Sequence, residues 1–598
     1  MAYQGKKLIN DPNDVVTEFI EGLVETYPGL QYLDGFPQIK VVLRADVLSA
    51  PYDKVAVISG GGSGHEPAHA GFVGPGMLTA AICGDVFTSP PVDSILTGIR
   101  AVTGSMGCLL IVKNYTGDRL NFGLAAEQAK SEGYKVEMVV VGDDCALPPP
   151  RGIAGRRGLA GTILVHKVAG AAADAGLSLA DVAAEAKHAS EMVGTMGVAL
   201  SVCTLPGHVT SDRLGPGLME LGLGIHGEPG AAVVDLQPVD VVVSHVLKQI
   251  LSPETKYVPI TRGSRVVLMI NGLGATPMME LMIAAGKAVP QLQVEHGLAI
   301  DRVYTGSFMT SLDMAGFSIS IMKAEPAILQ RLDAPTSAPS WPVGVEGDHP
   351  PTKIPIPVPA SCSGKTDERT FNEPQELNEQ GCMMEVAIEA AAIEIINLRE
   401  KLNEWDSKVG DGDCGSTMHR GATAVLEDMK RCYPLNDAAE TVNEIGASLR
   451  RVMGGTSGIL YDIFCKAAYA SLKGNHVITP SQWATALEVS VAAVSKYGGA
   501  VAGYRTMLDA LIPASKVLRE ILDTGDDALK AFLLSSEAAL TGAESTKNMH
   551  AQAGRSTYIA ADLLSSVPDP GAMAAAAWYR AAALAVENKV RPSKTEQL

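Results

Sequence analysis

A proline-rich segment in the middle of the chain restricts the fold most, because it separates two long stretches with different hydrophobic patterns. Between Leu332 and Thr370 the prolines stand at positions 335, 339, 342, 350, 351, 355, 357 and 359. Proline fixes φ and lacks a backbone N–H, so a segment this rich in proline is typical of an extended linker. A chain of 598 residues is also too long for one hydrophobic core, and its length favours about two to four domains.

The stretch before this segment has the pattern of an α/β fold. Short runs rich in valine and isoleucine alternate with alanine-rich stretches, and they lie at 54–59, 108–114, 136–142 and 264–271. Continuous apolar runs of this length predict buried strands between helices.

The stretch after the segment has a different pattern. Apolar residues recur at helical spacing over 382–405, 486–497 and 571–590, and runs of β-branched residues are scarce, which predicts an all-α domain. The expected organisation is an α/β unit over 1–331, a proline-rich linker over 332–375 and an all-α unit over 376–598.

Composition and charge exclude several classes of function. The net charge of −18 at pH 7 argues against nucleic acid as a main partner. No apolar run approaches membrane-spanning length, and the N-terminus MAYQGKKLINDPNDVV lacks the apolar core of a signal peptide. The nine cysteines form no C-x-x-C pair, so neither a disulfide framework nor a zinc site is indicated. We expect a cytoplasmic protein that has no nucleic-acid or membrane partner.

Three polar or glycine-rich corners in the first half each present an ionisable group. GGGSGHEPAHAGF, from Gly60, carries His65; IVKNYTGDRLNFG carries Lys113 and Asp118; and LGLGIHGEPG carries His226. Ligands collect where the strands of α/β sheets end, and imidazole and carboxylate groups suit proton transfer or nucleophilic attack. Each corner alone is also typical of a tight turn or an exposed loop. The three together indicate a site.

The loop around His226 raises the question of what its glycines do. Residues 222–227 fit the G-x-G-x-x-G pattern of a dinucleotide-binding turn, but Glu228 would repel phosphate and Pro229 begins a turn rather than a helix. A neutral imidazole can instead attack a carbonyl carbon, and the glycines would leave room for a small ketone. A histidine in such a loop is more often structural or exposed, so that alternative stays open.

In the second half, Asp406, Asp411 and Asp413 stand close together in NEWDSKVGDGDCGSTM. An EF-hand does not fit, because the twelfth position counted from Asp406 or Asp411 is not a glutamate. Three carboxylates in a glycine-rich loop leave coordination positions open, and magnesium fills such positions with substrate phosphates. The pattern predicts a site for ATP and magnesium, with a solvated acidic turn as the alternative.

A second glycine cluster, RVMGGTSGILYDIF, interrupts a helical pattern at Gly454 and Gly455. We expect Thr456 or Ser457 to cap the helix that restarts there, where exposed amides can hold a phosphate. A plain helix-turn-helix fits the cluster equally well. The tetrapeptide SGKT at 363–366 is not a P-loop, because the Walker motif needs glycine where Pro359 stands.

Seven motifs, in this order, closely resemble the single-chain, ATP-dependent dihydroxyacetone kinases, called triokinases in some eukaryotes. They are GGGSGHEPAHAGF, IVKNYTGDRLNFG, GLGIHGEPG, VGDGDCGSTM, MGGTSG, RTMLDALIPA and DPGA. The likeness covers almost the whole chain. It implies a multidomain protein: an N-terminal substrate unit of two α/β subdomains, about 1–190 and 191–331, and a C-terminal nucleotide unit built as a barrel of antiparallel helices.

The resemblance also implies an activity and residue roles. The activity is ATP-dependent phosphorylation of dihydroxyacetone, and of glyceraldehyde. His226 would hold the carbonyl as a hemiaminal, Asp118 would be the base, and His65 its hydrogen-bonding or acid partner. The implied substrate contacts are Gly62, Ser63, Gly64, His65, Lys113 and Asp118. The implied ligands of two magnesium ions are Asp406, Asp411 and Asp413. The implied nucleotide contacts are Asp411, Gly412, Asp413, Cys414, Gly454, Gly455, Tyr504, Arg505, Asp569, Pro570 and Gly571.

Two departures from the family pattern keep alternatives open. Tyr504 stands where many relatives have aspartate, and Cys414 matches the eukaryotic form rather than the histidine of many bacterial relatives. Some eukaryotic members of that form also cleave FAD to AMP and cyclic FMN, with manganese as an alternative metal. A third hypothesis is a ligand-sensing protein that does not turn over a substrate. The intact aspartates argue against it. The family further implies a homodimer, because many members pair the two units across one.

Overall fold

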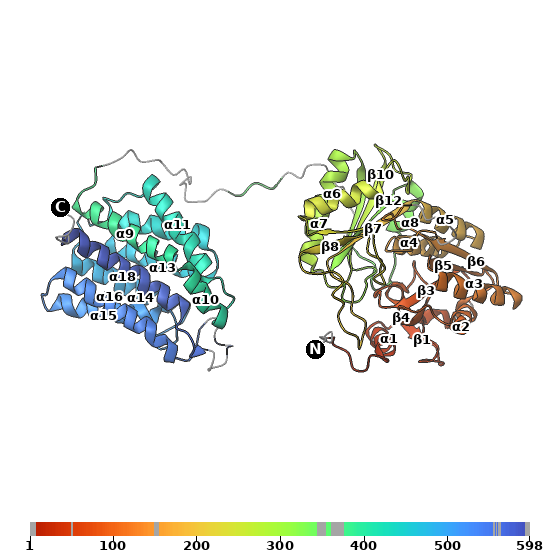
Figure 1. Cartoon of the computed structure of the whole chain (residues 1–598), viewed down its shortest axis with the longest axis horizontal. Coiled ribbons are helices and arrows are strands. Elements are labelled where there is room, and N and C mark those ends of the chain that lie inside the picture. Colours follow the sequence, from red (N-terminus) through yellow and green to blue (C-terminus); the bar gives the residue numbers. More distant parts are fainter. Residues whose placement is uncertain are drawn as a thin grey trace. The chain divides into compact units, whose positions relative to one another are not determined.

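The computed structural model describes residues 7–48, 52–148, 155–343, 355–359, 376–475, 477–553, 557, 559 and 564–591 (Figure 1). The chain divides into two compact units, Met1–Ile356 and Pro357–Leu598. Among the described residues, no helix has the length and apolar character needed to cross a membrane.

The first sheet of the N-terminal unit has the strand order β1-β2-β4-β3-β5-β6. Its central strands are parallel, with β1 and β2 antiparallel at one edge. The strands are β1 (Leu30–Tyr32), β2 (Val41–Arg44), β3 (Ala56–Ser63), β4 (Ala80–Val86), β5 (Cys108–Lys113) and β6 (Val136–Val141). The strands expected at 54–59, 108–114 and 136–142 are present as β3, β5 and β6.

Helices cover both faces of this sheet, which is why β3 and β5 are buried along their whole length. Alternate strand residues face opposite sides: Val57 and Leu109 pack under one set of helices, and Ile58 and Leu110 under the other. The first set is α1 (Val15–Thr26), α4 (Thr162–Asp174) and α5 (Leu179–Glu191), and the second is α2 (Val92–Val102) and α3 (Thr116–Ser131).

The second sheet has the order β11-β10-β12-β7-β8-β9, with only β10 and β11 parallel among its neighbours. Its strands are β7 (Val193–Ala199), β8 (Leu218–Leu221), β9 (Ala232–Asp235), β10 (Arg265–Gly272), β11 (Ala299–Gly306) and β12 (Gly316–Lys323). Helices α6 (Val239–Ile250) and α7 (Met278–Pro290) pack on it. The two sheets confirm an α/β unit made of two subdomains.

Helix α8 (Pro326–Asp333) and the residues that follow it pack on the N-terminal unit. The buried Lys167 ammonium, on α4, donates to the carbonyl oxygens of Arg331 and Ala334 at 2.8 and 2.7 Å, which satisfies the end of α8. Trp341 is only 9% exposed, so packed chain continues well past residue 332. Residues 344–354 and 360–375, including the SGKT tetrapeptide, lie outside the described residues.

The described part of the C-terminal unit contains helices and no strand. Asn378, Asp437, Thr479 and Asp527 each accept a backbone N–H and so fix a helix start. The helices are α9 (Glu379–Asn397), α10 (Arg399–Val409), α11 (Cys414–Cys432), α12 (Ala438–Met453), α13 (Gly455–Leu472), α14 (Pro480–Gly498), α15 (Leu508–Asp523), α16 (Ala528–Ser545) and α18 (Pro570–Val590).

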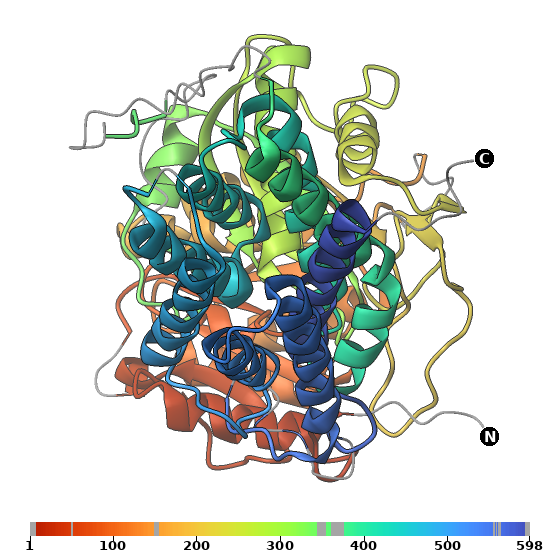
Figure 2. The same ribbon diagram turned by 90° about the vertical axis from the view of Figure 1, so that its left-hand side faces the viewer.

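These helices lie side by side as a closed ring, in which α18 packs beside α9 (Figure 2). They enclose a largely apolar cavity of about 900 Å³, lined from α9, α11, α12, α13, α14, α15, α16 and α18. The expected barrel of antiparallel helices is confirmed.

Candidate functional site

The carboxyl ends of β3 and β5 bring the first candidate residues together. The two strands are parallel neighbours, so their ends, Ser63 and Lys113, lie at the same edge of the sheet. A Cβ on Gly61 would lie 3.4 Å from Cε of Lys113 and 3.5 Å from Oδ2 of Asp118. Both side chains therefore lie directly against the glycine-rich end of β3.

Asp118 lies in the first turn of α3 and is buried, so the exposed-loop alternative does not hold. The Ser89 hydroxyl donates to its carboxylate, and the start of a helix favours negative charge. Lys113 is also buried. Burial lowers the pKa of Lys113, and the negative charge of Asp118 opposes that change. A cation and a carboxylate thus face each other away from bulk water.

His65 follows β3 and is completely buried. Its Nδ1 lies 2.9 Å from the carbonyl oxygen of Thr310, and its Nε2 lies 3.1 Å from Nε2 of His226. The ring of Phe87 stacks on the imidazole at a centroid distance of 5.0 Å. Burial, and then the charge of Lys113, lower the pKa of His65 well below its ordinary value. His65 is therefore a neutral ring in contact with His226.

Glu228 holds the imidazole of His226 from the side opposite His65. Nδ1 of His226 lies 2.7 Å from Oε1 of Glu228, and the backbone N–H of His226 donates to Oε2 at 3.0 Å. Burial alone would raise the pKa of Glu228, but the hydrogen bond from His226 and the charge of that ring lower it to about 2. Tyr115 packs edge-on against His226 at 4.7 Å and also lies beside the Lys113 ammonium.

Gly224 makes room for this carboxylate. A Cβ at Gly224 would lie 2.0 Å from Oε2 of Glu228 and 2.7 Å from Nη1 of Arg157. The sequence suggested that glycines beside His226 clear space for a ketone. The geometry corrects that interpretation for Gly224, whose missing side chain is needed by Glu228 and Arg157.

Arg157 anchors the loop and was not identified from the sequence. Its guanidinium donates to Asp144 at 2.6 Å and to the carbonyl oxygens of Gly222 and Pro229 at 2.7 and 3.4 Å. No local motif marks this residue, because its contacts join distant segments. Glu228 was interpreted only as a residue that repels phosphate, although its position two residues after His226 was a usable signal.

The other candidates near β3 have structural contacts. Ser63 donates its hydroxyl to the carbonyl oxygen of Gly84 at 2.7 Å and so joins β3 to β4. Cβ atoms at Gly62 and Gly64 would lie 2.6 Å from the backbone N of Thr88 and from the Phe87 ring, respectively. These two glycines therefore allow the segment that carries Phe87 to approach His65. His69 instead pairs with the buried His166 at 2.9 Å.

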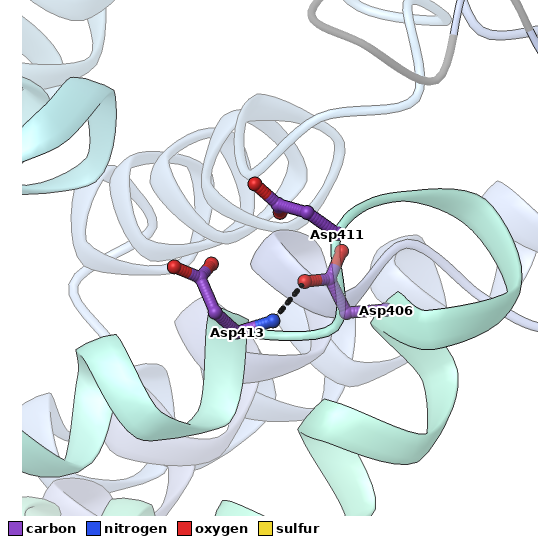
Figure 3. A group of neighbouring side chains, drawn as sticks. All are labelled: Asp406, Asp411 and Asp413. Carbon is purple, nitrogen blue, oxygen red and sulfur yellow. Dashed lines mark hydrogen bonds between the residues drawn. The ribbon is translucent and has the colours of Figure 1, made fainter. Parts of the chain in front are cut away.

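In the C-terminal unit, Asp406, Asp411 and Asp413 lie on one corner between α10 and α11 (Figure 3). One side-chain oxygen from each lies within 4.8 Å of the others. Oδ2 of Asp406 accepts the backbone N–H groups of Asp413 and Cys414 at 2.9 and 3.0 Å, which fixes the corner. Gly412, with φ +79°, allows the sharp turn between the last two aspartates.

The donor set on this corner suits a hard cation. Carboxylate oxygens that are exposed or half-exposed leave room for water and for phosphate oxygens, which magnesium keeps as ligands. Burial, and then the charge of Asp406, raise the pKa of Cys414 to about 12.

The glycine pair between α12 and α13 forms an open turn. Gly454 and Gly455 have φ of 65° and 55°, and a Cβ on either would meet nothing within 4 Å. Arg420, on α11, donates to the last carbonyl oxygen of α12 at 3.3 Å, which places the turn beside α11. The expectation that Thr456 or Ser457 caps α13 is wrong. The N-cap is Gly454, because the helix begins one residue later and no side chain caps it.

Arg505 is buried and links two chain segments by hydrogen bonds. Only 1% of the residue is exposed, and its guanidinium donates to the carbonyl oxygens of Thr546 and Val567 at 2.8 and 2.9 Å. Tyr504 is half-buried against the core of the helical unit. The structure thus gives the Arg505 side chain a role in holding the start of α18.

Asp569, Pro570 and Gly571 form that start. Asp569 caps α18 by accepting the N–H of Ala572 at 2.8 Å. Burial raises the pKa of Asp569 to about 6, although the Ala572 N–H and the charge of Arg505 oppose this shift. The negative charge of Asp406 also raises this pKa, so the α18 start lies in the electrostatic field of the aspartate corner.

Comparisons with known proteins give matches over both units. The Dak1 domain matches residues 21–340, and the DAK2 domain matches residues 408–584. A protein of Solanum lycopersicum named "Putative 3,4-dihydroxy-2-butanone kinase" is 80% identical over 98% of this chain and 99% of its own length. The "Triokinase/FMN cyclase" of Homo sapiens is 42% identical, covering 96% and 98%. The crystal structure of the dihydroxyacetone kinase from C. freundii in complex with AMP-PNP and Mg²⁺ matches with 40% identity and a TM-score of 0.66, over 97% of this chain and 99% of that one.

Proposed function

Because the chain belongs to the single-chain dihydroxyacetone kinase family and is a kinase, we propose that it phosphorylates dihydroxyacetone, and glyceraldehyde, with ATP. The contact between Nε2 of His226 and Nε2 of His65 beside Lys113 and Asp118 carries this proposal. It offers a nucleophile, an acid partner and a base within one largely buried group of side chains. The alternative of a sensor without turnover does not hold for a kinase.

His226 is the residue we assign to capture of the carbonyl carbon. Glu228 accepts the Nδ1 hydrogen, so the other ring nitrogen is the one available for attack. The ring lies between Glu228, Tyr115 and His65, which fixes its orientation. Capture at a carbonyl selects short hydroxyketones and aldehydes, since glycerol has no carbonyl to attack.

Asp118 is the residue we assign as base for the terminal hydroxyl. Its carboxylate lies against Gly61, where a small substrate can approach the backbone closely. The Lys113 side chain, which also lies against Gly61, supplies a positive charge for the substrate oxygens. A base that accepts the proton as the hydroxyl attacks phosphorus is typical of kinases.

Asp406, Asp411 and Asp413 are the residues we assign to hold magnesium with ATP, and the carboxylate chemistry of the corner supports this. The bound metal would neutralise charge on the phosphates during transfer. The open amides at Gly454 and Gly455 and the start of α18 at Asp569 are the proposed nucleotide contacts. Two further expectations, the homodimer and the cytoplasmic location, stay predictions.

A coupled assay of ADP release with dihydroxyacetone, ATP and magnesium tests the proposal directly. Asp118→Asn is expected to lower kcat by about a hundredfold or more, because the hydroxyl loses its base, while ketone binding persists. His226→Ala should abolish ketone capture and spare nucleotide binding, and Asp411→Ala should do the opposite. Absence of ketone-dependent ADP release would overturn the assignment. Adding 3,4-dihydroxy-2-butanone to the panel ranks the short hydroxyketones.

A second candidate activity is cleavage of FAD to AMP and cyclic FMN at the same nucleotide site. The name of the human relative, Triokinase/FMN cyclase, favours it. FAD as sole substrate with manganese tests this activity, and Asp411→Ala should remove it whereas His226→Ala should not.

A further inference from the structure

Arg420 connects the helix that begins at the aspartate corner with the glycine turn between α12 and α13. It lies on α11, whose N-cap is Asp413. Its Nε donates to the carbonyl oxygen of Val452 at 3.4 Å, and its Nη2 donates to that of Met453 at 3.3 Å. These are the last two carbonyls before Gly454. The guanidinium therefore fixes the end of α12 at the point where the open turn begins.

The end of α12 lacks a partner of its own, which is why the contact with Arg420 matters. The last carbonyls of a helix have no acceptor site filled within the helix, and a cation is favoured at a helix C-terminus. In the described part of the chain, Gly454 at the C-cap returns no backbone hydrogen bond to α12. Both glycines of the turn take positive φ, and glycine loses more conformational freedom than other residues when it is fixed. The contact with Arg420 therefore holds a segment that is otherwise weakly restrained.

Asp413, Thr417 and Arg420 form one face of α11. Their spacing of four and three residues places their side chains above one another on a helix. The N–H of Thr417 donates to the carbonyl oxygen of Asp413 at 2.9 Å, and the hydroxyl oxygen of Thr417 accepts from Nη2 of Arg420 at 3.0 Å. At about 1.5 Å per residue, this face spans about 10 Å. One helix face thus sets the separation between the proposed metal ligands and the proposed phosphate contacts.

The charge of Arg420 distinguishes it from the two arginines in the last turn of α12. Nε of Arg450 lies 3.4 Å from Oδ2 of Asp462. Nη2 of Arg451 lies 2.6 Å from Oδ2 of Asp428. Arg420, among the described residues, donates instead to neutral oxygens, two carbonyls and a hydroxyl. A guanidinium has donors beyond those that serve these contacts, so its positive charge remains available to an anionic ligand.

We propose that Arg420 is a positioning residue of the nucleotide site: it holds the Gly454–Gly455 turn at a fixed distance from the aspartate corner and adds positive charge beside the phosphates of ATP. This inference rests on the proposed function, in which the corner holds magnesium with ATP and the turn contacts the nucleotide. Arginine suits this position because its guanidinium is always charged and presents several donors in one plane. Methionine would fill much of the same space, but it has neither the charge nor the hydrogen bonds.

The test uses the full-length protein, and calorimetric titration with AMP-PNP and magnesium measures the dissociation constant of the nucleotide. Arg420→Met should raise this constant by about tenfold or more, because hydrogen bonds from a charged donor are lost. The KM for ATP should rise by a similar factor, whereas the KM for dihydroxyacetone, which binds to the other unit, should not change. Hydrogen exchange of the amides at 455–458 should become faster. Arg420→Lys keeps the charge and should recover part of the affinity.

Arg450→Met is the matched control. It removes a cation from the last turn of α12, where the Arg450 side chain is 59% exposed, and it spares the contacts of Arg420. It should keep the wild-type dissociation constant and exchange rates. Unchanged binding in Arg420→Met, or an equal loss in Arg450→Met, would overturn the role of Arg420.

Two further outcomes separate this role from the proposed function and from a loss of folding. A wild-type protein that does not bind AMP-PNP with magnesium would overturn the proposed nucleotide site itself. If Arg420→Met does not fold, Arg420→Lys decides, because it should still bind the nucleotide more weakly than Arg450→Met does. Equal binding by Arg420→Lys and Arg450→Met would then contradict the inference.

Discussion

At the scale of single residues, the loop around His226 needs a glycine at position 224 because the Glu228 carboxylate occupies the space of a side chain there. We predict that Gly224→Ala weakens ketone capture by about tenfold, because the new Cβ would lie 2.0 Å from Oε2 of Glu228 and a displaced charge-assisted hydrogen bond costs about that much. Nucleotide binding, which depends on the other unit, should be unchanged. Titration with labelled dihydroxyacetone and with a nucleotide analogue measures both.

Gly215→Ala is the control for that substitution. Nothing lies within 4 Å of a Cβ at Gly215, and this glycine lies in the same subdomain. Wild-type capture is expected for Gly215→Ala. Equal losses in the two variants would mean that the N-terminal unit tolerates no added methyl group, and would contradict a specific effect on Glu228.

The sequence could predict which side chains are candidates for the chemistry, but not which other residues position them. His65, Asp118 and His226 stand in short motifs at expected strand ends, and the motif alone marks them. Arg157 stands 65 positions before one of the carbonyls that it binds, so no local pattern reports the contact. The motif around Arg505 predicts a contact with the nucleotide. The structure adds that this side chain is buried and holds two chain segments together through the carbonyl oxygens of Thr546 and Val567.

At the scale of elements, α4 makes the N-terminal unit sensitive to acid. Burial lowers the pKa of His166 on α4 to about 3 from 6.5, and it lowers the pKa of its partner His69, and of His65, well below 6.5. The unfolded chain takes up protons below pH 6.5 that these folded rings do not, so their stabilisation is complete above pH 6.5 and declines as pH falls toward 3. We expect the calorimetric melting temperature of this unit to fall over that window.

His166→Met should make the decline with pH shallower, because it removes one of the groups that the unfolded chain protonates. His245→Met removes an exposed histidine of the same unit and should leave the slope as it is. A slope that is the same in His166→Met and in the wild type would rule out the buried pair as the cause.

A second element, α18, depends on Arg505. We predict that Arg505→Met destabilises the helical unit by about 3 kcal/mol, because two hydrogen bonds from a charged donor to buried carbonyls are lost. It should also weaken nucleotide binding, since the start of α18 carries Asp569. Hydrogen exchange of peptides over 564–575 and nucleotide titration check both effects. Arg580→Met, at an exposed position on the same helix, should change neither.

Element types could be predicted from the sequence more fully than their ends. Buried strands and helices have clear apolar periods, so β3, β5, β6 and the all-α unit were expected. The start of α13 was misassigned because Thr456 and Ser457 are good caps by type, whereas Gly454 and Gly455 take positive φ and allow the helix to begin earlier. The packing of Trp341 on the first unit was not expected either, because proline content dominates the local pattern there.

At the scale of the whole molecule, the groups proposed to activate the hydroxyl and the phosphoryl donor belong to different units. Asp118 and His226 lie in Met1–Ile356, and Asp411 lies in Pro357–Leu598. Phosphoryl transfer needs both sets of groups at the reacting atoms. In a homodimer, an N-terminal unit can work with the C-terminal unit of its own chain or with that of its partner, and these two arrangements give different results when inactive chains are mixed.

We predict that His226→Ala and Asp411→Ala, each inactive alone, regain activity when they are co-expressed and purified as a mixed dimer. If partners supply each other's units, one of the two pairings in a mixed dimer joins an intact N-terminal unit to an intact C-terminal unit. Random assembly from equal amounts makes half of the dimers mixed, so about one quarter of wild-type activity should return. Pairing within one chain restores nothing, because every chain then carries a defect. ADP release that stays at the level of the separate variants would therefore refute the exchange of units across a dimer.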